Sequence, residues 1–200
     1  MNLQTEQNRQ LHLAEWIDTH LSREYRLTSR AEQLSHPCFD LAIEHHAAIC
    51  LLQDAKLFGS MYALVRVQLE ALVNGLWLRH VATENDLKKY ESDERVGFGT
   101  RVDAIEQQLG TAGGLLSYLK KEQWDIFCSF THSGYQSILR RVGETHTGSG
   151  NYKPEEIVTA LRHSGLYALM AAVELASMVG DKGLIDDAMQ VLKGYGENEV

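Results

Sequence analysis

Residues 57–81 read LFGSMYALVRVQLEALVNGLWLRHV, and this stretch decides the fold. Wound as an α-helix it leaves almost no polar face, and a helix of this kind is normally central in its bundle. Gly59 and Gly75 would let a neighbouring helix approach closely. Charged residues within the stretch, such as Arg66 and Glu70, argue against a membrane span. We therefore predict a central helix of a helical protein.

Six further stretches carry the spacing or the boundary signals of helices. They cover approximately residues 3–26, 39–54, 101–109, 115–141, 154–179 and 184–192. Pro37 disfavours helical geometry at His36, so the second stretch is predicted to start near Phe39. Pro154 opens the long helix that Gly180 ends.

Two segments are less regular than these helices. Residues 83–95 are densely charged and indicate a solvated helix or a loop, and the helix at 115–141 carries a break signal at Ser133-Gly134. No stretch alternates as a strand would. We predict an all-α, single-domain bundle of about six or seven helices over residues 1–193, followed by a flexible tail at 194–200.

The composition narrows the class of protein. The chain has 200 residues, 44% of them apolar, and 27 acidic against 19 basic residues give a formal charge of −8. This charge disfavours binding to long nucleic acid, although the local basic residues Lys120, Lys121, Arg140 and Arg141 leave it open. The polar N-terminus has no export signal, and three scattered cysteines indicate free thiols. We expect a cytoplasmic protein with no membrane span.

The common catalytic and cofactor motifs are missing from the sequence. It has no phosphate-binding loop, no dinucleotide fingerprint, no nucleophile elbow and no Glu-x-x-His pair, so we predict no cofactor. The nearest approach to a metal cluster is Glu44-His45-His46 with Cys50. Adjacent histidines point about 100° apart on a helix, so partly exposed helix histidines explain this group better, and we predict no metal site.

Arg66 and Glu70 form the sharpest polar feature, one turn apart on the helix expected to be most buried. Charges inside an apolar helix must be paired and hydrogen-bonded, or their desolvation is uncompensated. One interpretation is a structural ion pair that fixes helix register. The other is a polar pocket at the centre of the bundle, against an aromatic wall.

A second polar cluster follows in the sequence at Ser129-Phe-Thr-His132. Phe127 and Phe130 should pack inward, and Ser129 and His132 lie at i, i+3 on one side of a helix. His132 is either a satisfied core histidine, for example one bonded to Glu70, or an imidazole that faces a pocket.

The Arg66-x-x-x-Glu70 pair in an apolar helix, followed about sixty residues later by Ser129-x-x-His132, resembles uncharacterised bacterial helical proteins of the DUF5677 and DUF6988 type. The resemblance covers residues 57–132 best. It implies an all-α fold without a settled activity, and it implies that Arg66, Glu70, Ser129 and His132 belong together.

A more distant resemblance is to the HEPN class, helical bundles that often cut RNA as dimers. That class carries Arg, four to six residues, then His at the start of a long helix. Matching pairs here are Arg30 with His36 and Arg141 with His146. The first pair ends at Pro37 and the second lies in a Gly-rich stretch, so chance explains both pairs better.

Three hypotheses for function follow. The preferred one is a binding or interaction module with a buried Arg-Glu-His cluster that forms a homo-oligomer, most simply a homodimer. The alternative is a metal-independent ribonuclease in a toxin or phage-defence role, with Arg141 and His146 as the motif. The third is a pocket enzyme acting on a small anion held by Arg66.

Overall fold

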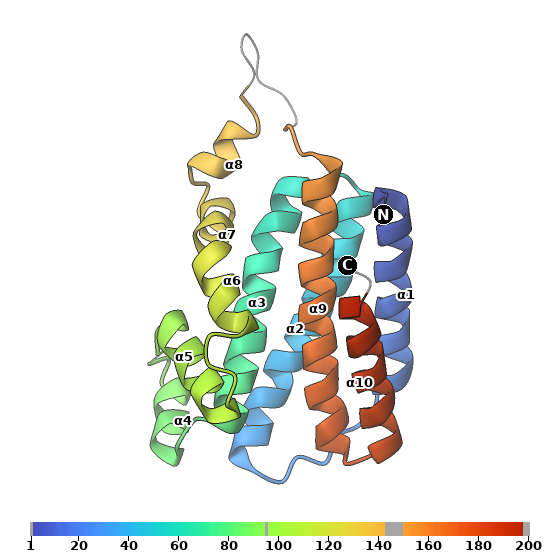
Figure 1. The fold of residues 1–200 in the computed structure, drawn as a ribbon. Helices are drawn as coiled ribbons and strands as arrows, with labels where there is room; N and C mark the ends of the chain where they lie inside the picture. The colour runs from blue at the N-terminus through green and yellow to red at the C-terminus, as the bar shows by residue number, and fades with distance from the viewer. Residues whose placement is uncertain (1, 95, 143–149, 198–200) are drawn as a thin grey trace.

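The computed structural model describes residues 2–94, 96–142 and 150–197 (Figure 1). Within these residues the chain forms ten α-helices and no strand. They are α1 (Leu3–Leu21), α2 (Arg30–Asp54), α3 (Phe58–His80), α4 (Glu84–Glu91), α5 (Phe98–Leu109), α6 (Leu115–Glu122), α7 (Trp124–Thr131), α8 (Tyr135–Leu139), α9 (Pro154–Val179) and α10 (Lys182–Glu197). The all-α prediction is confirmed, and the predicted number of six or seven helices is wrong.

The number of helices is higher for two local reasons. The stretch at 115–141 is split into α6, α7 and α8, because the backbone leaves helical geometry at Gln123 (φ −120°) and is left-handed at Ser133 (φ 52°). The charged stretch at 83–95 contains the helix α4, because Thr83 and Asp86 cap its start reciprocally. Their side chains each accept a hydrogen bond from the other residue's backbone N–H.

Helix α2 begins at Arg30 and contains Pro37, so the prediction that Pro37 keeps His36 outside the helix is wrong. Ser29 Oγ accepts from the Glu32 N–H at 3.1 Å, and the Glu32 carboxylate accepts from the Ser29 N–H at 3.1 Å. This capping and the burial of apolar residues farther along α2 offset the roughly 3 kcal/mol that an interior proline costs a helix.

Helix α3 is central, as the sequence predicts. It packs against α2, α5, α7 and α9 (Figure 1). A Cβ atom at Gly75 would lie 2.5 Å from a ring carbon of Phe39 on α2, and Phe39 is fully buried. Glycine at this position therefore allows the two helices to come close.

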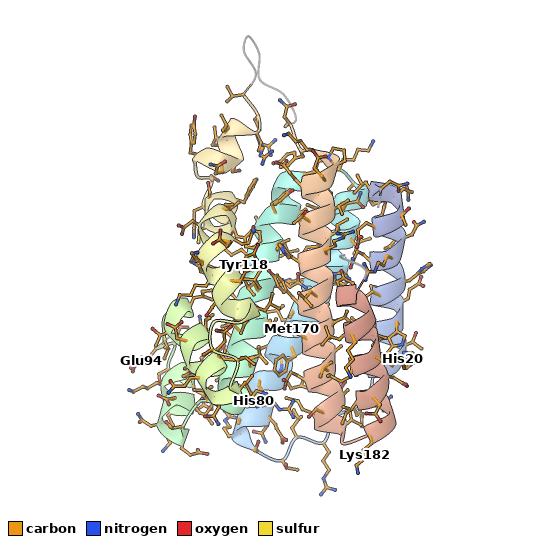
Figure 2. All side chains as sticks on the ribbon, viewed as in Figure 1. His20, His80, Glu94, Tyr118, Met170 and Lys182 are labelled. Carbon is orange, nitrogen blue, oxygen red and sulfur yellow. The ribbon has the colours of Figure 1, made fainter. Side chains whose placement is uncertain are left out.

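The long helices and the short ones lie on different sides of α3. The short helices α5 to α8 run along one side, and α9, α10 and α1 lie on the other (Figure 1). Side chains fill the space between these helices (Figure 2). None of the described helices has both the length and the apolar character needed to cross a bilayer.

The two ends of the chain differ in part from prediction. Helix α1 ends at Leu21, before the expected boundary near Arg26. Helix α10 continues to Glu197, past the predicted end at Leu192, and its Tyr195 is buried. The predicted tail at 194–200 thus begins inside a helix, and residues 198–200 lie outside the described part of the chain.

Candidate functional site

Arg66 and Glu70 lie one turn apart on α3, where this helix meets α7. Arg66 Nη2 is 3.1 Å from Glu70 Oε1, and the two side chains are 14% and 30% exposed. The guanidinium lies over the ring of Trp124, 4.7 Å from its centroid. The aromatic ring beside the pair therefore comes from α7, and the pair is partly withdrawn from water.

Ser129 and His132 are not bonded to this ion pair. Ser129 Oγ accepts from the backbone N–H of Gln136 at 3.0 Å. His132 is exposed at the end of α7, and its described hydrogen bond is from its backbone N–H to the Cys128 carbonyl. The expectation of a core histidine bonded to Glu70, within a buried Arg-Glu-His cluster, is therefore wrong. Phe127 and Phe130 are buried, as predicted. A joint role for Arg66, Glu70, Ser129 and His132 stays a prediction.

The two Arg–His pairs that match the ribonuclease motif differ in their placement. Arg30 and His36 both lie at the start of the long helix α2, so the expectation that this pair lies outside a long helix is wrong. Six residues of helix turn the two side chains about 120° apart. Arg30 is paired with Glu91, while His36 packs edge-on against Tyr25. Neither pairing brings Arg30 and His36 together.

The second Arg–His pair is Arg141 with His146. His146 lies outside the described residues, and Arg141 follows α8. The ribonuclease alternative that rests on this pair stays a prediction.

His46 belongs to a polar group between α2, α3 and α9 whose other members, Gln68 and Ser164, the sequence did not indicate. His46 is completely buried, and its Nδ1 is 2.9 Å from Ser164 Oγ. Gln68 donates from Nε2 to the carbonyls of Ala42 and Ser164, each at 3.0 Å. Burial lowers the pKa of His46 to about 4, so the ring is neutral at pH 7. The expectation of a partly exposed histidine at this position is wrong.

His46 and Cys50 share a face of α2, as their spacing suggests, with Nε2 and Sγ 4.0 Å apart. Burial raises the pKa of the Cys50 thiol to about 12. Among the described residues there is no group of three or more histidine, cysteine, aspartate or glutamate side chains that could hold a metal ion.

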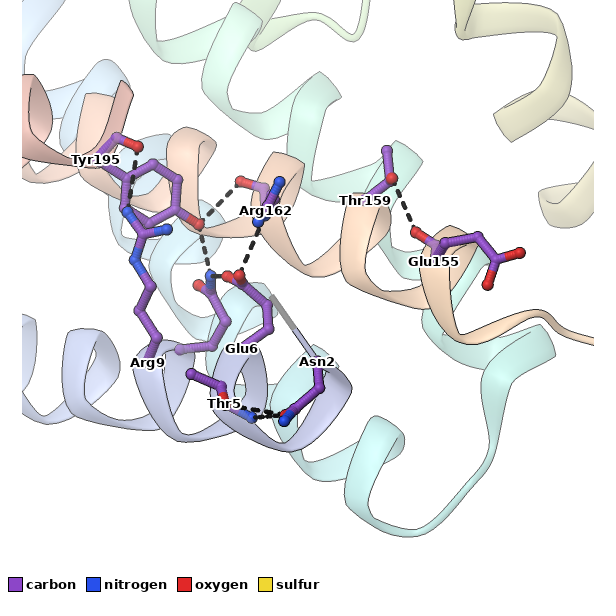
Figure 3. Close-up of polar contacts among 9 residues, drawn as sticks. Asn2, Thr5, Glu6, Arg9, Glu155, Thr159, Arg162 and Tyr195 are labelled. Carbon is purple, nitrogen blue, oxygen red and sulfur yellow. Dashed lines mark hydrogen bonds and ion pairs between the residues drawn. The ribbon is translucent and has the colours of Figure 1, made fainter. Parts of the chain in front are cut away.

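A second buried network joins α1, α9 and α10 (Figure 3). Glu6 is completely buried and pairs with Arg162, with Nε and Oε2 at 3.1 Å. Gln10 donates from Nε2 to Glu6 at 2.5 Å and to the Tyr195 hydroxyl at 2.6 Å. Tyr195 donates in turn to the Arg162 carbonyl at 3.1 Å. This network ties both ends of the chain to α9.

Sequence reasoning missed this network because Glu6 and Gln10 lie in a stretch that is polar throughout. One signal was available, namely their i, i+4 spacing on one helix face. Gly165 leaves room for the network, since a Cβ atom there would lie 2.2 Å from both Gln10 Oε1 and the Tyr195 hydroxyl. Nothing in the sequence indicates which helices these residues would join.

A cleft of about 610 Å³ lies between α1 and α2, and we call it the α1–α2 cleft. Its floor is apolar and its rim is charged. The floor consists of Ala14, Ile17, Leu21, Ile43 and Leu175, with His46 beside them, and the exposed Ala47 also lines the cleft. The rim carries four carboxylates, Glu15, Asp18, Asp40 and Glu44, against one guanidinium, Arg23.

His36 contributes a buried nitrogen atom, Nε2, without a described hydrogen-bond partner to the lining of the cleft. Burial lowers the pKa of His36, while the Asp40 carboxylate opposes this shift. The neutral ring leaves Nε2 able to accept or donate one hydrogen bond, depending on its tautomer.

Fold and sites together define an all-α bundle with polar networks buried between its helices. A family model described as "Family of unknown function (DUF6988)" matches residues 39–198. The chain belongs to this family, which confirms the resemblance seen in the sequence. The match does not show a relation to the HEPN class. Comparisons with curated proteins and with solved structures found no match.

Proposed function

We propose that this chain is a binding module that holds a small organic cation in the α1–α2 cleft. The observation that carries the proposal is the volume of the cleft, about 610 Å³. Sites for small molecules typically measure about 300–1,000 Å³ and combine apolar walls with a few polar groups. The apolar floor would bury the hydrocarbon part of such a ligand.

The charge of the rim selects the class of ligand. Four carboxylates face one guanidinium around the opening, so the local field favours a positive group. His36 adds a buried ring nitrogen without a described partner, which can accept a hydrogen bond from an ammonium group. The rings of Tyr25 and His36, whose centroids are 4.4 Å apart, offer an aromatic surface for the same cation.

The Arg66–Glu70 pair has a different role in this proposal. Its two charges are bonded to each other, and Trp124 covers the guanidinium. These contacts support the structural interpretation, in which the pair fixes α3 against α7. They do not favour the hypothesis that Arg66 holds a small anionic substrate.

Three probes with the same six-carbon chain test the charge preference: hexylammonium, hexanoate and hexanol. We expect isothermal titration calorimetry at pH 7 to show hexylammonium binding most tightly. The double variant Asp40→Asn/Glu44→Gln should weaken hexylammonium about tenfold, because each exposed charge pair contributes up to about 1 kcal/mol. A matched control, Glu122→Gln/Asp125→Asn, removes two exposed carboxylates from α6 and α7, across the bundle from α1 (Figure 1).

A blocking variant tests the location of the site. Ala47 is exposed and lines the cleft, so Ala47→Trp should place an indole in part of it and weaken the binding of hexylammonium. Equal binding of the three probes, or hexylammonium binding that Ala47→Trp does not weaken, would refute the proposal.

A further inference from the structure

A second, smaller cavity lies between α3, α7 and α9, on the other side of α3 from α2. Its volume is about 190 Å³, and we call it the Tyr62 cavity. Half of its lining residues are aromatic or aliphatic, namely Tyr62 of α3, Ile126, Phe127 and Phe130 of α7, and Ala160 of α9. The other half are polar or charged, namely Gln123, Thr159, His163 and the Arg140–Glu156 pair. It shares no lining residue with the α1–α2 cleft.

The hydroxyl of Tyr62 makes no hydrogen bond within the described part of the protein. The side chain is only 7% exposed, and its hydroxyl is buried. An unpaired buried hydroxyl costs a protein roughly 1–3 kcal/mol. Burial, assisted by the Glu156 carboxylate, raises the pKa of Tyr62, so the group remains a neutral hydrogen-bond donor.

Aromatic rings pack against the ring of Tyr62. Tyr62 stacks on Phe130 at a centroid distance of 4.8 Å and on Tyr152 at 5.5 Å. Phe130 lines the cavity together with Phe127 of α7. Flat, polarisable walls of this kind suit a planar ring, because aromatic pairs gain stabilisation beyond the area they bury.

The charges at the end of the cavity cancel each other. Arg140 Nη1 and Nη2 donate to the two carboxylate oxygens of Glu156 at 2.6 and 2.9 Å. Arg140 also lies over the Tyr152 ring, 5.7 Å from its centroid. A bidentate pair of this type leaves no net charge to attract an ion, so a neutral ligand fits the cavity better than an anion or a cation.

The size of the cavity sets the size of the ligand. An apolar cavity of about 150 Å³ admits benzene, so a cavity of about 190 Å³ accommodates one six-membered ring. We propose that the Tyr62 cavity binds a neutral molecule with a single aromatic ring, and that an acceptor atom of this ring takes the hydrogen bond of the Tyr62 hydroxyl. This site is independent of the α1–α2 cleft.

Pyridine and benzene are a matched pair of probes, since they differ only in the acceptor nitrogen. We expect titrations followed by protein NMR at pH 8 to show wild-type protein binding pyridine more tightly than benzene. Tyr62→Phe removes only the hydroxyl. It should weaken pyridine about tenfold, the effect of losing one buried hydrogen bond, and leave benzene unchanged.

Tyr167 supplies the matched control. It is also buried with an unpartnered hydroxyl in the described structure, but it does not line the cavity. Tyr167→Phe should therefore leave the binding of both probes unchanged. Thermal unfolding of both variants checks that they fold, and Thr159→Trp, at an exposed position on the cavity wall, provides a second test because it should block pyridine.

Several outcomes would overturn the proposal: no binding of pyridine to wild type, equal affinity for pyridine and benzene, or pyridine binding that Tyr62→Phe does not weaken. Ala47→Trp separates the two sites. It should weaken hexylammonium binding and leave pyridine binding intact, so either proposal can fail without the other.

Discussion

His46 shows at the scale of one residue how burial makes stability depend on pH. Its pKa is lowered to about 4 in the fold and has the ordinary value of 6.5 in the unfolded chain. Between these values the unfolded chain binds more protons, so the free energy of unfolding decreases as pH falls from 6.5 to 4. Above pH 6.5 the ring is neutral in both states, and this contribution is constant.

We predict that wild type loses about 3 kcal/mol more stability than His46→Gln between pH 7 and pH 4. Urea denaturation at several pH values measures the difference. Glutamine can still reach Ser164, so the variant mainly removes the titrating group. His12→Gln, at an exposed position on α1, is the control and should follow wild type. Identical pH profiles for wild type and His46→Gln would contradict the prediction.

At the scale of an element, α6 is held by a carboxylate from a neighbouring helix. Gly114 at its start offers no side-chain cap. Glu106 of α5 accepts hydrogen bonds from the backbone N–H groups of Gly113 and Ser117, each at 3.0 Å, and from Ser117 Oγ at 2.5 Å. Burial opposes the charge, but the bonds from Ser117 and Gly113 outweigh it and keep the pKa of Glu106 lowered.

Glu106→Ala should therefore reduce the free energy of unfolding by about 2–3 kcal/mol, because hydrogen bonds to a charged group are lost. The stabilisation in wild type is present above pH 4.5, the ordinary value for glutamate, and is lost as pH falls through the lower pKa of the folded state. Equilibrium denaturation at pH 7 and pH 3 measures both effects. Gln107→Ala, at the exposed next position, should change little.

A loss below 0.5 kcal/mol for Glu106→Ala at pH 7 would show that the carboxylate does not hold α6.

Helix α2 shows that a cap at the start of a helix can also come from within the same element. Its capping box at Ser29 and Glu32 starts the helix early enough to include Pro37. The sequence prediction placed the helix boundary at Pro37 because an interior proline destabilises a helix. It did not include the capping box and the packing of α2, which offset this destabilisation.

At the scale of the whole molecule, the homodimer predicted from the sequence stays a prediction. The helices α6, α7 and α8 keep several large apolar side chains exposed, namely Tyr118, Ile126, Tyr135, Ile138 and Leu139. Adjacent apolar residues on a surface are typical of an interface. Sedimentation velocity should give twice the chain mass of 22.5 kDa.

The double variant Tyr135→Lys/Ile138→Lys should shift this species to the monomer. Leu41→Lys/Leu51→Lys adds the same charge at exposed apolar positions of α2 and should leave the dimer intact. A monomeric wild type at tens of micromolar, or a dimer disrupted equally by both variants, would contradict an interface on α6 to α8.

Periodicity and composition alone determined the helical class, the central position of α3 and the pairing of Arg66 with Glu70. These features depend on residues within a few turns of one another, and helical geometry then determines which side chains share a face. The family resemblance also came from the sequence, from two short motifs about sixty residues apart.

Only the tertiary structure decided which polar residues meet. Glu6 and Arg162 are far apart in sequence, as are His46 and Ser164, and both pairs form because α1 and α2 pack on α9. The α1–α2 cleft and the Tyr62 cavity likewise exist only between packed helices. Periodicity predicts which face of a helix is buried, but it does not predict which other helix packs against that face. Sites built from several helices therefore could not be predicted from the sequence.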